Sequence, residues 1–217
     1  MSRREKGMQP RHPDCHRVLP RLSACIATAL LVAACQVLPE RPRAATTYDA
    51  AAVLQREVCR ALLDALTTTA TCSPADILDA GCGTGYGARL LAERWPAARL
   101  AAADFAAAMA QKAASTAPAC VADIEALPFR AAAFDLWWSS LTVQWCDAQR
   151  VFAEAARVLR PQGQLALSTL GPGTYAELRR AFAGIDRHRH TLDFSEPARL
   201  AAAAEAAGFT DLQVAQP

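Results

Sequence analysis

The sequence lacks the features that would place it at once in several large classes of protein. Lys and Arg number 23 against 21 Asp and Glu, for a formal net charge of +2, and this balance does not point to the concentrated basic face that nucleic acid would require. None of the eight cysteines forms a Cys-x-x-Cys pair, so zinc-ligand spacing is absent. The apolar run at residues 23–34 is shorter than the roughly 20 residues of a membrane-spanning helix. We therefore expect no nucleic-acid partner, no metal and no membrane association.

The chain does contain a regular alternation of strand and helix signals after a proline-rich linker at residues 39–43. Leu54, Val58, Leu62 and Leu66 recur every four positions, which predicts a helix over residues 48–66. Beyond it, we expect strands at residues 76–80, 100–103, 119–122, 134–139, 164–169 and 212–215, and helices at 85–95, 106–115, 148–159, 175–185 and 197–207. This alternation predicts one α/β domain over residues 43–217, with a doubly wound, mostly parallel sheet.

Residues 77–87 (ILDAGCGTGYG) place an apolar strand directly before a glycine-rich turn that opens a helix. Ligands of such sheets bind at the carboxyl ends of the strands. The third glycine comes one residue too early for a dinucleotide fingerprint, G-x-G-x-x-G, which would need it where Tyr86 stands. The carboxylate of Asp79 is unfavourable beside a phosphate and favourable beside an ammonium group. S-adenosyl-L-methionine carries an ammonium and a sulfonium and fits this turn; a tight turn without ligand is the alternative.

Three further features follow in chain order at predicted strand ends. Asp104 comes 19 residues after Gly85, about where an acidic residue binds ribose hydroxyls, although an Asp here can also cap a helix. The Asp123 side chain can accept a hydrogen bond from an adenine amino group, while Ile124 covers the ring. Residues 134–136 (FDL) open the next strand. The ordered series strengthens the prediction of a bound S-adenosyl-L-methionine.

These residues resemble class I S-adenosylmethionine-dependent methyltransferases, which have a Rossmann-like sheet. Residues 123–129 (DIEALPF), 139–146 (SSLTVQWC) and 168–178 are similar to one subgroup, the malonyl-[acyl-carrier protein] O-methyltransferases of biotin synthesis. The resemblance covers residues 43 to 217, and departs from the family at residues 161–163 (PQG), where Pro-Gly-Gly is usual. It implies a further antiparallel seventh strand beyond Pro217, so we expect strand seven to be missing and the sheet edge unfinished.

The resemblance implies methyl transfer to the free carboxylate of a malonyl thioester, with an acyl-carrier protein or a small-molecule thioester such as malonyl-CoA as partner. That carboxylate is already ionised at neutral pH, so no general base is expected. Taken together, the residues expected to contact the cofactor are Asp79, Gly81, Cys82, Gly83, Gly85, Asp104, Phe105, Met109, Asp123, Ile124 and Leu141. Those expected on the substrate side are Tyr48, Gln144 and Trp145, for which packing at a strand end is the alternative.

Two other functions stay open at this point. The cofactor motifs are shared with class I methyltransferases that act on other small molecules, and only the region around Gln144 and Trp145 separates them. A truncated chain that binds cofactor without catalysis is the second alternative. The basic stretch at residues 179–190 could meet an acidic carrier protein, could bind the substrate carboxylate, or could be a solvated helix face. We expect a monomer.

The first 42 residues form an extension that we expect to be signal-like or disordered. Residues 1–22 are rich in Arg, His and Pro, and residues 23–34 are apolar. Val32-Ala33-Ala34-Cys35 matches a lipoprotein cleavage box, so export through residues 23–35 is an alternative. Because S-adenosyl-L-methionine is made and used inside the cell, we expect a cytoplasmic protein with reduced cysteines.

Overall fold

The computed structural model describes residues 22–28, 52–69, 73–183, 185 and 190–215, and in that part of the chain it shows one seven-stranded sheet. The strand order is β4-β3-β2-β5-β6-β1-β7, and each pair of neighbouring strands runs parallel. The strands are β1 (Leu22–Thr28), β2 (Asp76–Ala80), β3 (Arg99–Asp104), β4 (Ala119–Val121), β5 (Phe134–Ser140), β6 (Leu159–Thr169) and β7 (Phe209–Ala215). The helices are α2 (Val53–Thr69), α3 (Tyr86–Arg94), α4 (Ala107–Ala113), the 3₁₀ turn η1 (Val143–Trp145), α5 (Ala148–Val158), α6 (Ala176–Phe182) and α7 (Pro197–Ala206).

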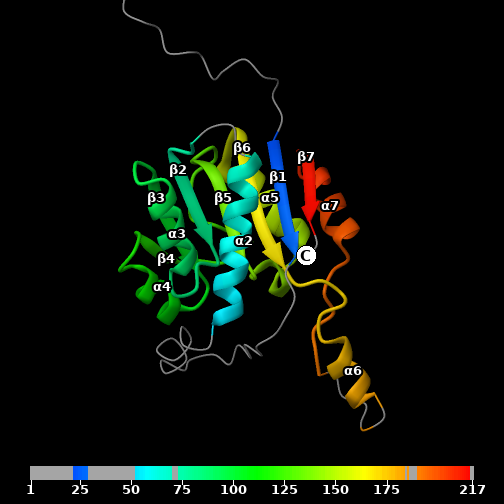
Figure 1. Cartoon of the computed structure of the whole chain (residues 1–217). Coiled ribbons are helices and arrows are strands. Elements are labelled where there is room, and N and C mark those ends of the chain that lie inside the picture. Colours follow the sequence, from blue (N-terminus) through cyan, green and yellow to red (C-terminus); the bar gives the residue numbers. More distant parts are fainter. Residues whose placement is uncertain (1–21, 29–51, 70–72, 184, 186–189, 216–217) are drawn as a thin grey trace, which may run out of the picture.

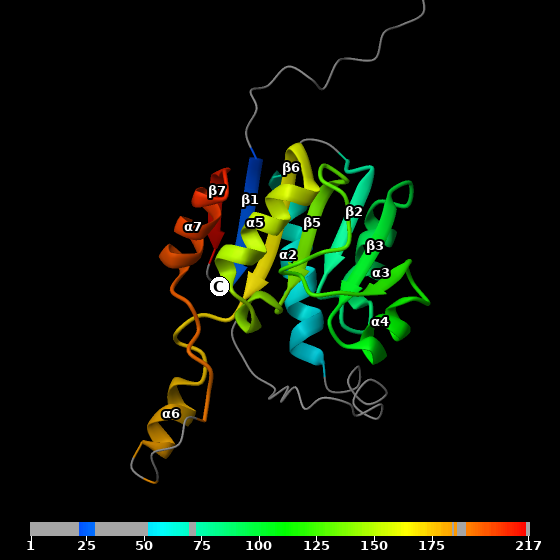
Figure 2. The same ribbon diagram turned by 180° about the vertical axis from the view of Figure 1, so that it is seen from behind.

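Helices cover both faces of the sheet, as Figures 1 and 2 show from opposite sides. On one face, Leu62 of α2 and Leu91 of α3 pack with Trp138 of β5 in one apolar cluster. On the other face, Phe152 of α5 packs with Phe209 of β7 in a second cluster that also includes α7. Parallel strands covered on both faces need apolar side chains in both directions, which is why β2 is buried throughout. The Rossmann-like, doubly wound fold of class I methyltransferases is thereby confirmed.

The predicted strands and helices agree with the structure to within a few residues over the described part of the chain. The largest difference is β6, which begins at Leu159 rather than at residue 164 because the Arg160–Gly163 segment bulges between two paired stretches. Residues 48–51 of the first predicted helix lie outside the described residues.

One strand of the sheet, β1, comes from residues 1–42, which the sequence predicts to be an extension outside the domain. β1 lies between β6 and β7, with Cys25 in register with Ala166 on one side and with Gln213 on the other. The position beside β6 is therefore occupied by a parallel strand from near the start of the chain (Figure 1). The rest of residues 1–42, including the cleavage box, lies outside the described residues.

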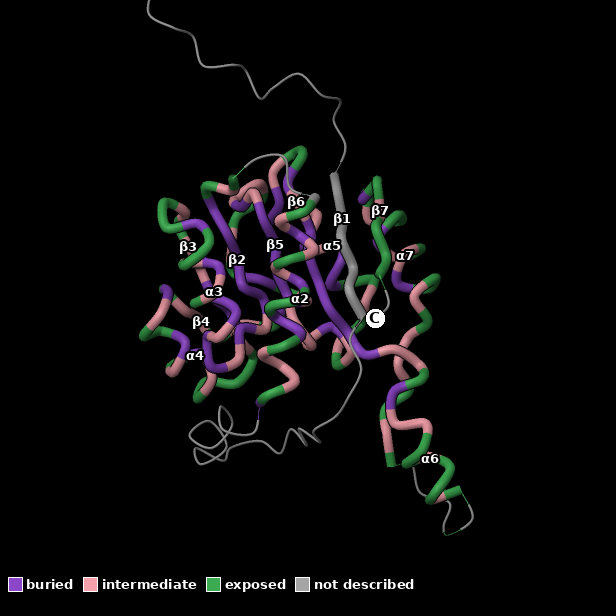
Figure 3. Tube along the Cα trace, in the orientation of Figure 1, coloured by how far each residue is buried: buried purple, intermediate pink, exposed green. Residues whose placement is uncertain are grey.

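An arm that carries α6 projects from the body beyond the carboxyl ends of the strands (Figures 1 and 2). No residue of α6 is buried, and Figure 3 shows the contrast with the buried strands β2, β5 and β6. Arg179 ties the base of the arm together, because its guanidinium donates to the carbonyls of Pro172 and Thr174 at 2.5 and 2.6 Å. The ring of Tyr175 stacks on that of Phe194, where the chain returns.

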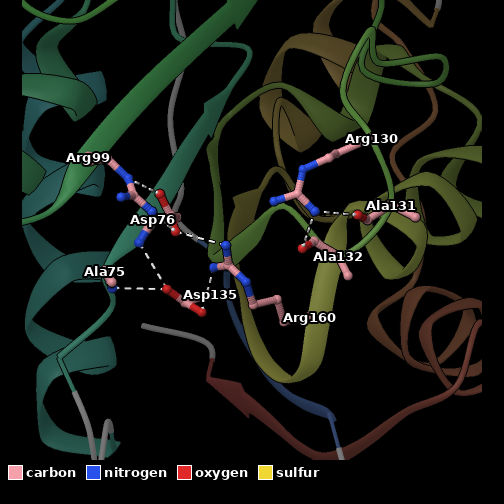
Figure 4. Close-up of polar contacts among 8 residues, drawn as sticks. All are labelled: Ala75, Asp76, Arg99, Arg130, Ala131, Ala132, Asp135 and Arg160. Atoms are coloured by element: carbon pink, nitrogen blue, oxygen red, sulfur yellow. Dashed lines mark hydrogen bonds and ion pairs between the residues drawn. The ribbon is translucent and has the colours of Figure 1, made fainter.

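A cluster of charged side chains holds the amino ends of the central strands together (Figure 4). Arg160 donates to Asp76 and to Asp135, each at 2.8 Å, and so joins β6 to β2 and β5. Arg99 of β3 adds a second ion pair to Asp76 at 2.6 Å, and Asp135 also accepts from the backbone amide of Asp76. Asp135, in the predicted FDL motif, therefore lies at the end of the sheet opposite the glycine turn.

Candidate functional site

The glycine-rich turn between β2 and α3 lies at the carboxyl edge of the sheet. Gly81, Gly83 and Gly85 have φ values of 77°, 53° and 87°, a left-handed conformation that glycine adopts without steric cost. A Cβ at Gly85 would lie 3.0 Å from the Cα of Ala113, so the turn packs directly on α4. A Cβ at Gly83 would meet no atom within 4 Å. The turn thus leaves bare backbone open at Gly83, where a ligand can approach closely.

Asp79 lies beneath this turn as a buried carboxylate, 2% exposed. The backbone amide of Ala88 hydrogen-bonds to the carboxylate, but Oδ2 has no hydrogen-bond partner. Burial raises the pKa of Asp79 to about 7, the Ala88 hydrogen bond opposes that rise, and the negative charge of Asp104 adds to it. A cation that binds beside a buried carboxylate with an unsatisfied oxygen stabilises the ionised form of that carboxylate.

Asp104 ends β3 and contacts the glycine turn directly. Its carboxylate accepts from the backbone amide of Gly83 at 2.8 Å and from that of Ala106 at 2.9 Å. Burial raises the pKa of Asp104, and these two hydrogen bonds oppose the rise. Because the charges of Asp104 and Asp79 interact, the two predicted cofactor carboxylates belong to one electrostatic site.

The predicted adenine side is built from the residues after β3 and β4. Phe105 is 74% exposed beside Asp104, and Met109 of α4 is half-buried. Asp123 is exposed, and its carboxylate accepts from the backbone amide of Glu125 at 2.9 Å. Ile124 is 4% exposed and packs in the apolar cluster under α5. Phe105 and Asp123 are therefore accessible to a ligand, whereas Ile124 supports the loop from below.

Helix α5 holds the loop that carries Asp123. The backbone amide of Leu127 donates to Glu154 at 2.6 Å, and Arg157 donates to the carbonyl of Phe129 at 2.8 Å. Glu125 accepts from the backbone amide of Asp147 at 2.7 Å. This segment, one of those that resemble the family, is thus fixed by contacts with α5 and its N-terminal cap rather than by a strand.

The predicted substrate side follows β5. Leu141 has a φ of 53°, a strained left-handed conformation for a residue with a side chain, and η1 begins two residues later. Gln144 is committed at both ends of its amide: Nε2 donates to the Leu141 carbonyl at 2.7 Å, and Oε1 accepts from Thr169 at 3.2 Å. Trp145 is 49% exposed. Trp145 is therefore accessible, and Gln144 connects η1 to β6.

The structure adds residues that the sequence analysis did not single out. Thr142 donates to the Gly81 carbonyl at 3.2 Å, and its side chain fills the space that a Cβ at Gly81 would need. Gly87 opens α3 where a Cβ would lie 2.9 Å from Oδ2 of Asp79 and 3.0 Å from Nε1 of Trp138. Gly87 continues the glycine spacing of the turn, which was a usable signal; nothing local in the sequence marks Thr142 or Trp138.

The remaining predictions concern a thiol, metal ions and residues outside the described part of the chain. Cys82 is buried in the turn, and burial raises the pKa of its thiol, so it is a neutral packing group. Within the described ranges, no group of three His, Cys, Asp or Glu side chains could hold a metal ion, and no helix has the length and apolarity to cross a membrane. Tyr48 and residues 186–189 of the basic stretch lie outside the described residues.

Comparison with known proteins gives one domain match and a consistent set of relatives. Residues 78–167 match the model of a methyltransferase domain. The chain is 45% identical over 172 residues to malonyl-[acyl-carrier protein] O-methyltransferase of Dechloromonas aromatica (strain RCB), covering 79% of this chain and 64% of that protein. The enzyme of the same name from Gallionella capsiferriformans (strain ES-2) is 44% identical, covering 78% of this chain and 62% of that protein. The chain thus spans less than two thirds of the length of these relatives.

Among solved structures, the chain is similar to phosphoethanolamine N-methyltransferase 2 of Haemonchus contortus in complex with S-adenosyl-L-methionine. The TM-score is 0.64 at 18% identity, covering 79% of this chain and 42% of that one. At this identity the likeness establishes the fold alone.

Proposed function

We propose that this chain, which carries a methyltransferase domain with the class I fold, transfers the methyl group of S-adenosyl-L-methionine to the free carboxylate of malonyl-[acyl-carrier protein] or malonyl-CoA. The observation that carries the cofactor is the buried Asp79 carboxylate, whose Oδ2 has no partner, next to bare backbone at Gly83. The observation that carries the acceptor is a sequence identity of at least 38% to several malonyl-[acyl-carrier protein] O-methyltransferases.

The chain's own residues would hold the cofactor through three kinds of contact. Asp79 binds the ammonium of the amino-acid tail, since a cation offsets the free-energy cost of its burial. Asp104 binds the ribose hydroxyls while it holds the Gly83 amide. Phe105 and Asp123 lie exposed for the adenine, the first for its ring and the second for its amino group. The bound cofactor supplies an activated methyl group on a sulfonium.

For this methyl transfer the protein has to bind the two reactants, orient them and exclude water. The acceptor carboxylate is ionised at neutral pH, so no side chain has to remove a proton. Its negative charge and the sulfonium charge disappear together during transfer, and a dry site favours that loss of charge. Holding the two reacting atoms in line could contribute up to about 7–11 kcal/mol. The exposed ring of Trp145 at the carboxyl edge is the described side chain that we assign to the acceptor.

The reaction proposed here also implies the setting of the protein. S-adenosyl-L-methionine is made and used inside the cell, so we propose a cytoplasmic protein that acts as a monomer and meets an acyl-carrier protein. The export alternative predicts instead that tagged protein appears in the membrane fraction.

Two measurements test the proposal in sequence. Calorimetric titration with S-adenosyl-L-methionine should give saturable binding, and no heat would mean that the chain binds no cofactor. A methyl-transfer assay should then favour malonyl-[acyl-carrier protein] over malonyl-CoA and over unrelated amine or phenol acceptors. Binding with transfer to an unrelated acceptor would assign another class I activity, and binding with no transfer at all would assign a cofactor-binding chain without catalysis.

A further inference from the structure

Two buried polar atoms without partners converge beneath the glycine turn. Trp138 is fully buried on β5, and its indole Nε1 has no hydrogen-bond partner. Oδ2 of Asp79 on the neighbouring strand β2 is in the same state. A Cβ at Gly87 would lie 3.0 Å from the first atom and 2.9 Å from the second. A donor and an acceptor, each costly to leave unpaired, therefore border the same small space, which stays open because residue 87 is a glycine.

We propose that Trp138 is a positioning residue for Asp79: its indole N–H donates to the Asp79 carboxylate whenever that carboxylate is ionised, in the free protein as in the ligand complex, and so keeps it ionised and aimed at the cationic ligand. This rests on the proposed function only in naming the ligand as the amino-acid tail of S-adenosyl-L-methionine. The residue would act through Asp79 and would not touch the reacting atoms.

Trp137, the residue before Trp138 on β5, provides a comparison within the same strand. Trp137 is also fully buried, and its Nε1 is also without a hydrogen bond. Its side chain faces the opposite side of the sheet, where it packs in the apolar cluster with Phe152 and Val151. The two residues thus share chemistry, burial and strand, and they differ in that Trp138 borders the Gly87 position together with Asp79, whereas Trp137 lies on the opposite face of the sheet. Trp137 is therefore a matched control.

The charged and titratable groups around Asp79 allow a pH test. Asp104 on β3 interacts with it and is itself a carboxylate. Cys59 on α2 and Cys82 in the turn also interact with its charge. Burial raises the pKa of Cys59 to about 12 and that of Cys82 as well, so neither thiol ionises between pH 5.5 and 9. The positive charge of Arg60, the next residue along α2, acts on Cys59 and opposes the rise of its pKa.

The main experiment compares Trp138→Phe with Trp137→Phe. Each keeps an aromatic ring and removes one N–H group. Titration with S-adenosyl-L-methionine from pH 5.5 to 9 should show affinity reduced about 10-fold at pH 7 for Trp138→Phe, since a hydrogen bond to a charged group is lost. The reduction should shrink toward pH 9, where the Asp79 carboxylate is ionised without help. Trp137→Phe should bind as the unmodified chain does. An equal loss at every pH, or an equal loss in both variants, would mean that Trp138 only packs.

A second measurement does not require cofactor binding. The pH at which the free protein loses the stability linked to Asp79 should move upward in Trp138→Phe and stay in place in Trp137→Phe, because removing a nearby donor disfavours the ionised carboxylate. If the unmodified chain binds no cofactor but this midpoint moves, the proposed function fails and the Trp138–Asp79 relationship stands. If cofactor binds and neither the affinity profile nor the midpoint moves, the positioning role fails and the proposed function stands.

Gly87→Ala tests the shared space itself. The added methyl group would lie against both orphan atoms, so cofactor affinity should fall while the chain still folds. Gly173→Ala is the control, because a Cβ there meets no atom within 4 Å and the residue is exposed. Unchanged affinity in Gly87→Ala would show that Asp79 and Trp138 do not act through this space.

Discussion

Oδ2 of Asp104 accepts a hydrogen bond from the backbone amide of Gly83 at 2.8 Å, across the gap between β3 and the glycine turn. The residue predicted to bind the cofactor's sugar therefore also fixes the loop that approaches it. Its other oxygen accepts from the amide of Ala106 and so begins the segment that leads into α4. One side chain is therefore expected both to bind the cofactor and to hold the surrounding backbone in place.

Asp104→Asn should lower affinity for S-adenosyl-L-methionine by at least about 10-fold, because the amide loses the charge and keeps only one acceptor oxygen for two backbone donors and the ribose. Calorimetric titration at pH 8 measures it. Asp147→Asn is the control: Asp147 caps α5 by accepting from the Gln149 amide, and Asn caps a helix as well as Asp does. Equal affinity in the two variants would exclude Asp104 from the site.

Asp79→Asn should produce a chain that is more stable and does not bind cofactor. The pKa of Asp79 in the folded chain, about 7, lies above the unfolded value near 3.9, so folding favours the protonated form. The associated stability is present below about pH 4 and is lost as the pH rises to about 7. At pH 8 the free energy of unfolding of the variant should therefore be about 2 kcal/mol higher than that of the unmodified chain, and the difference should vanish near pH 4. Urea denaturation across this range checks the sign, and a variant less stable at pH 8 would contradict it.

Arg160→Ala should lower the free energy of unfolding by about 1–2 kcal/mol at pH 7, because it removes charged hydrogen bonds to both Asp76 and Asp135. Arg99→Ala should cost less, since the Arg99 side chain is 78% exposed. Hydrogen bonds from Arg99, then from Arg160, hold the pKa of Asp76 below its usual value. The stabilisation is thus complete above about pH 4 and is lost as the pH falls through that lower value. Cofactor affinity should stay unchanged, because this cluster lies at the opposite end of the sheet.

Gln162→Gly should raise the free energy of unfolding by about 1 kcal/mol. Gln162 has a φ of 68°, where a side chain costs about 1–2 kcal/mol and glycine costs nothing, although glycine gains entropy in the unfolded chain. The matched change Gln164→Gly, in the paired part of β6, should instead lower it by about 0.5–1 kcal/mol. Denaturant midpoints with equal slopes decide the matter, and a loss of stability in both variants would contradict the explanation.

Backbone amides of residues 22–28 should exchange slowly with deuterium in the full chain, because β1 is hydrogen-bonded to a strand on each side. Mass spectrometry of peptides from this region measures the exchange. A synthetic peptide of the same sequence gives the unprotected rate. Exchange in the full chain as fast as in the peptide would show that this segment does not pair with β6 and β7 in solution.

The sequence predicted the central part of the molecule well, because buried parallel strands and amphipathic helices have strong, local patterns. The glycine turn, Asp79 and Asp104 were predictable for the same reason: a short motif fixes both the backbone and the position in the sheet. The positive φ of Gln162 also explains why the family usually has glycine there. The free-energy cost of Gln162 in place of glycine follows from its backbone conformation, which the sequence alone does not give.

Other features depend on contacts between distant residues and leave no local signal. Thr142 meets Gly81 across 61 residues, and Trp138 meets Asp79 only because β5 pairs with β2. Residues 22–28 look like part of an export signal when taken alone. Their pairing in the sheet depends on β6 and β7, more than 130 positions further along.

The place of β1 in the sheet makes it a neighbour of strands that the ribosome adds more than 130 residues later. Its parallel partners, β6 and β7, are complete only when synthesis has reached Ala215. The chain loses conformational entropy when so long a loop closes, and this slows the pairing of β1. The central strands and their helices would therefore assemble first, and β1 would join the sheet last. Until then residues 22–28 have no strand to pair with, and the speed of translation sets how long they remain unpaired.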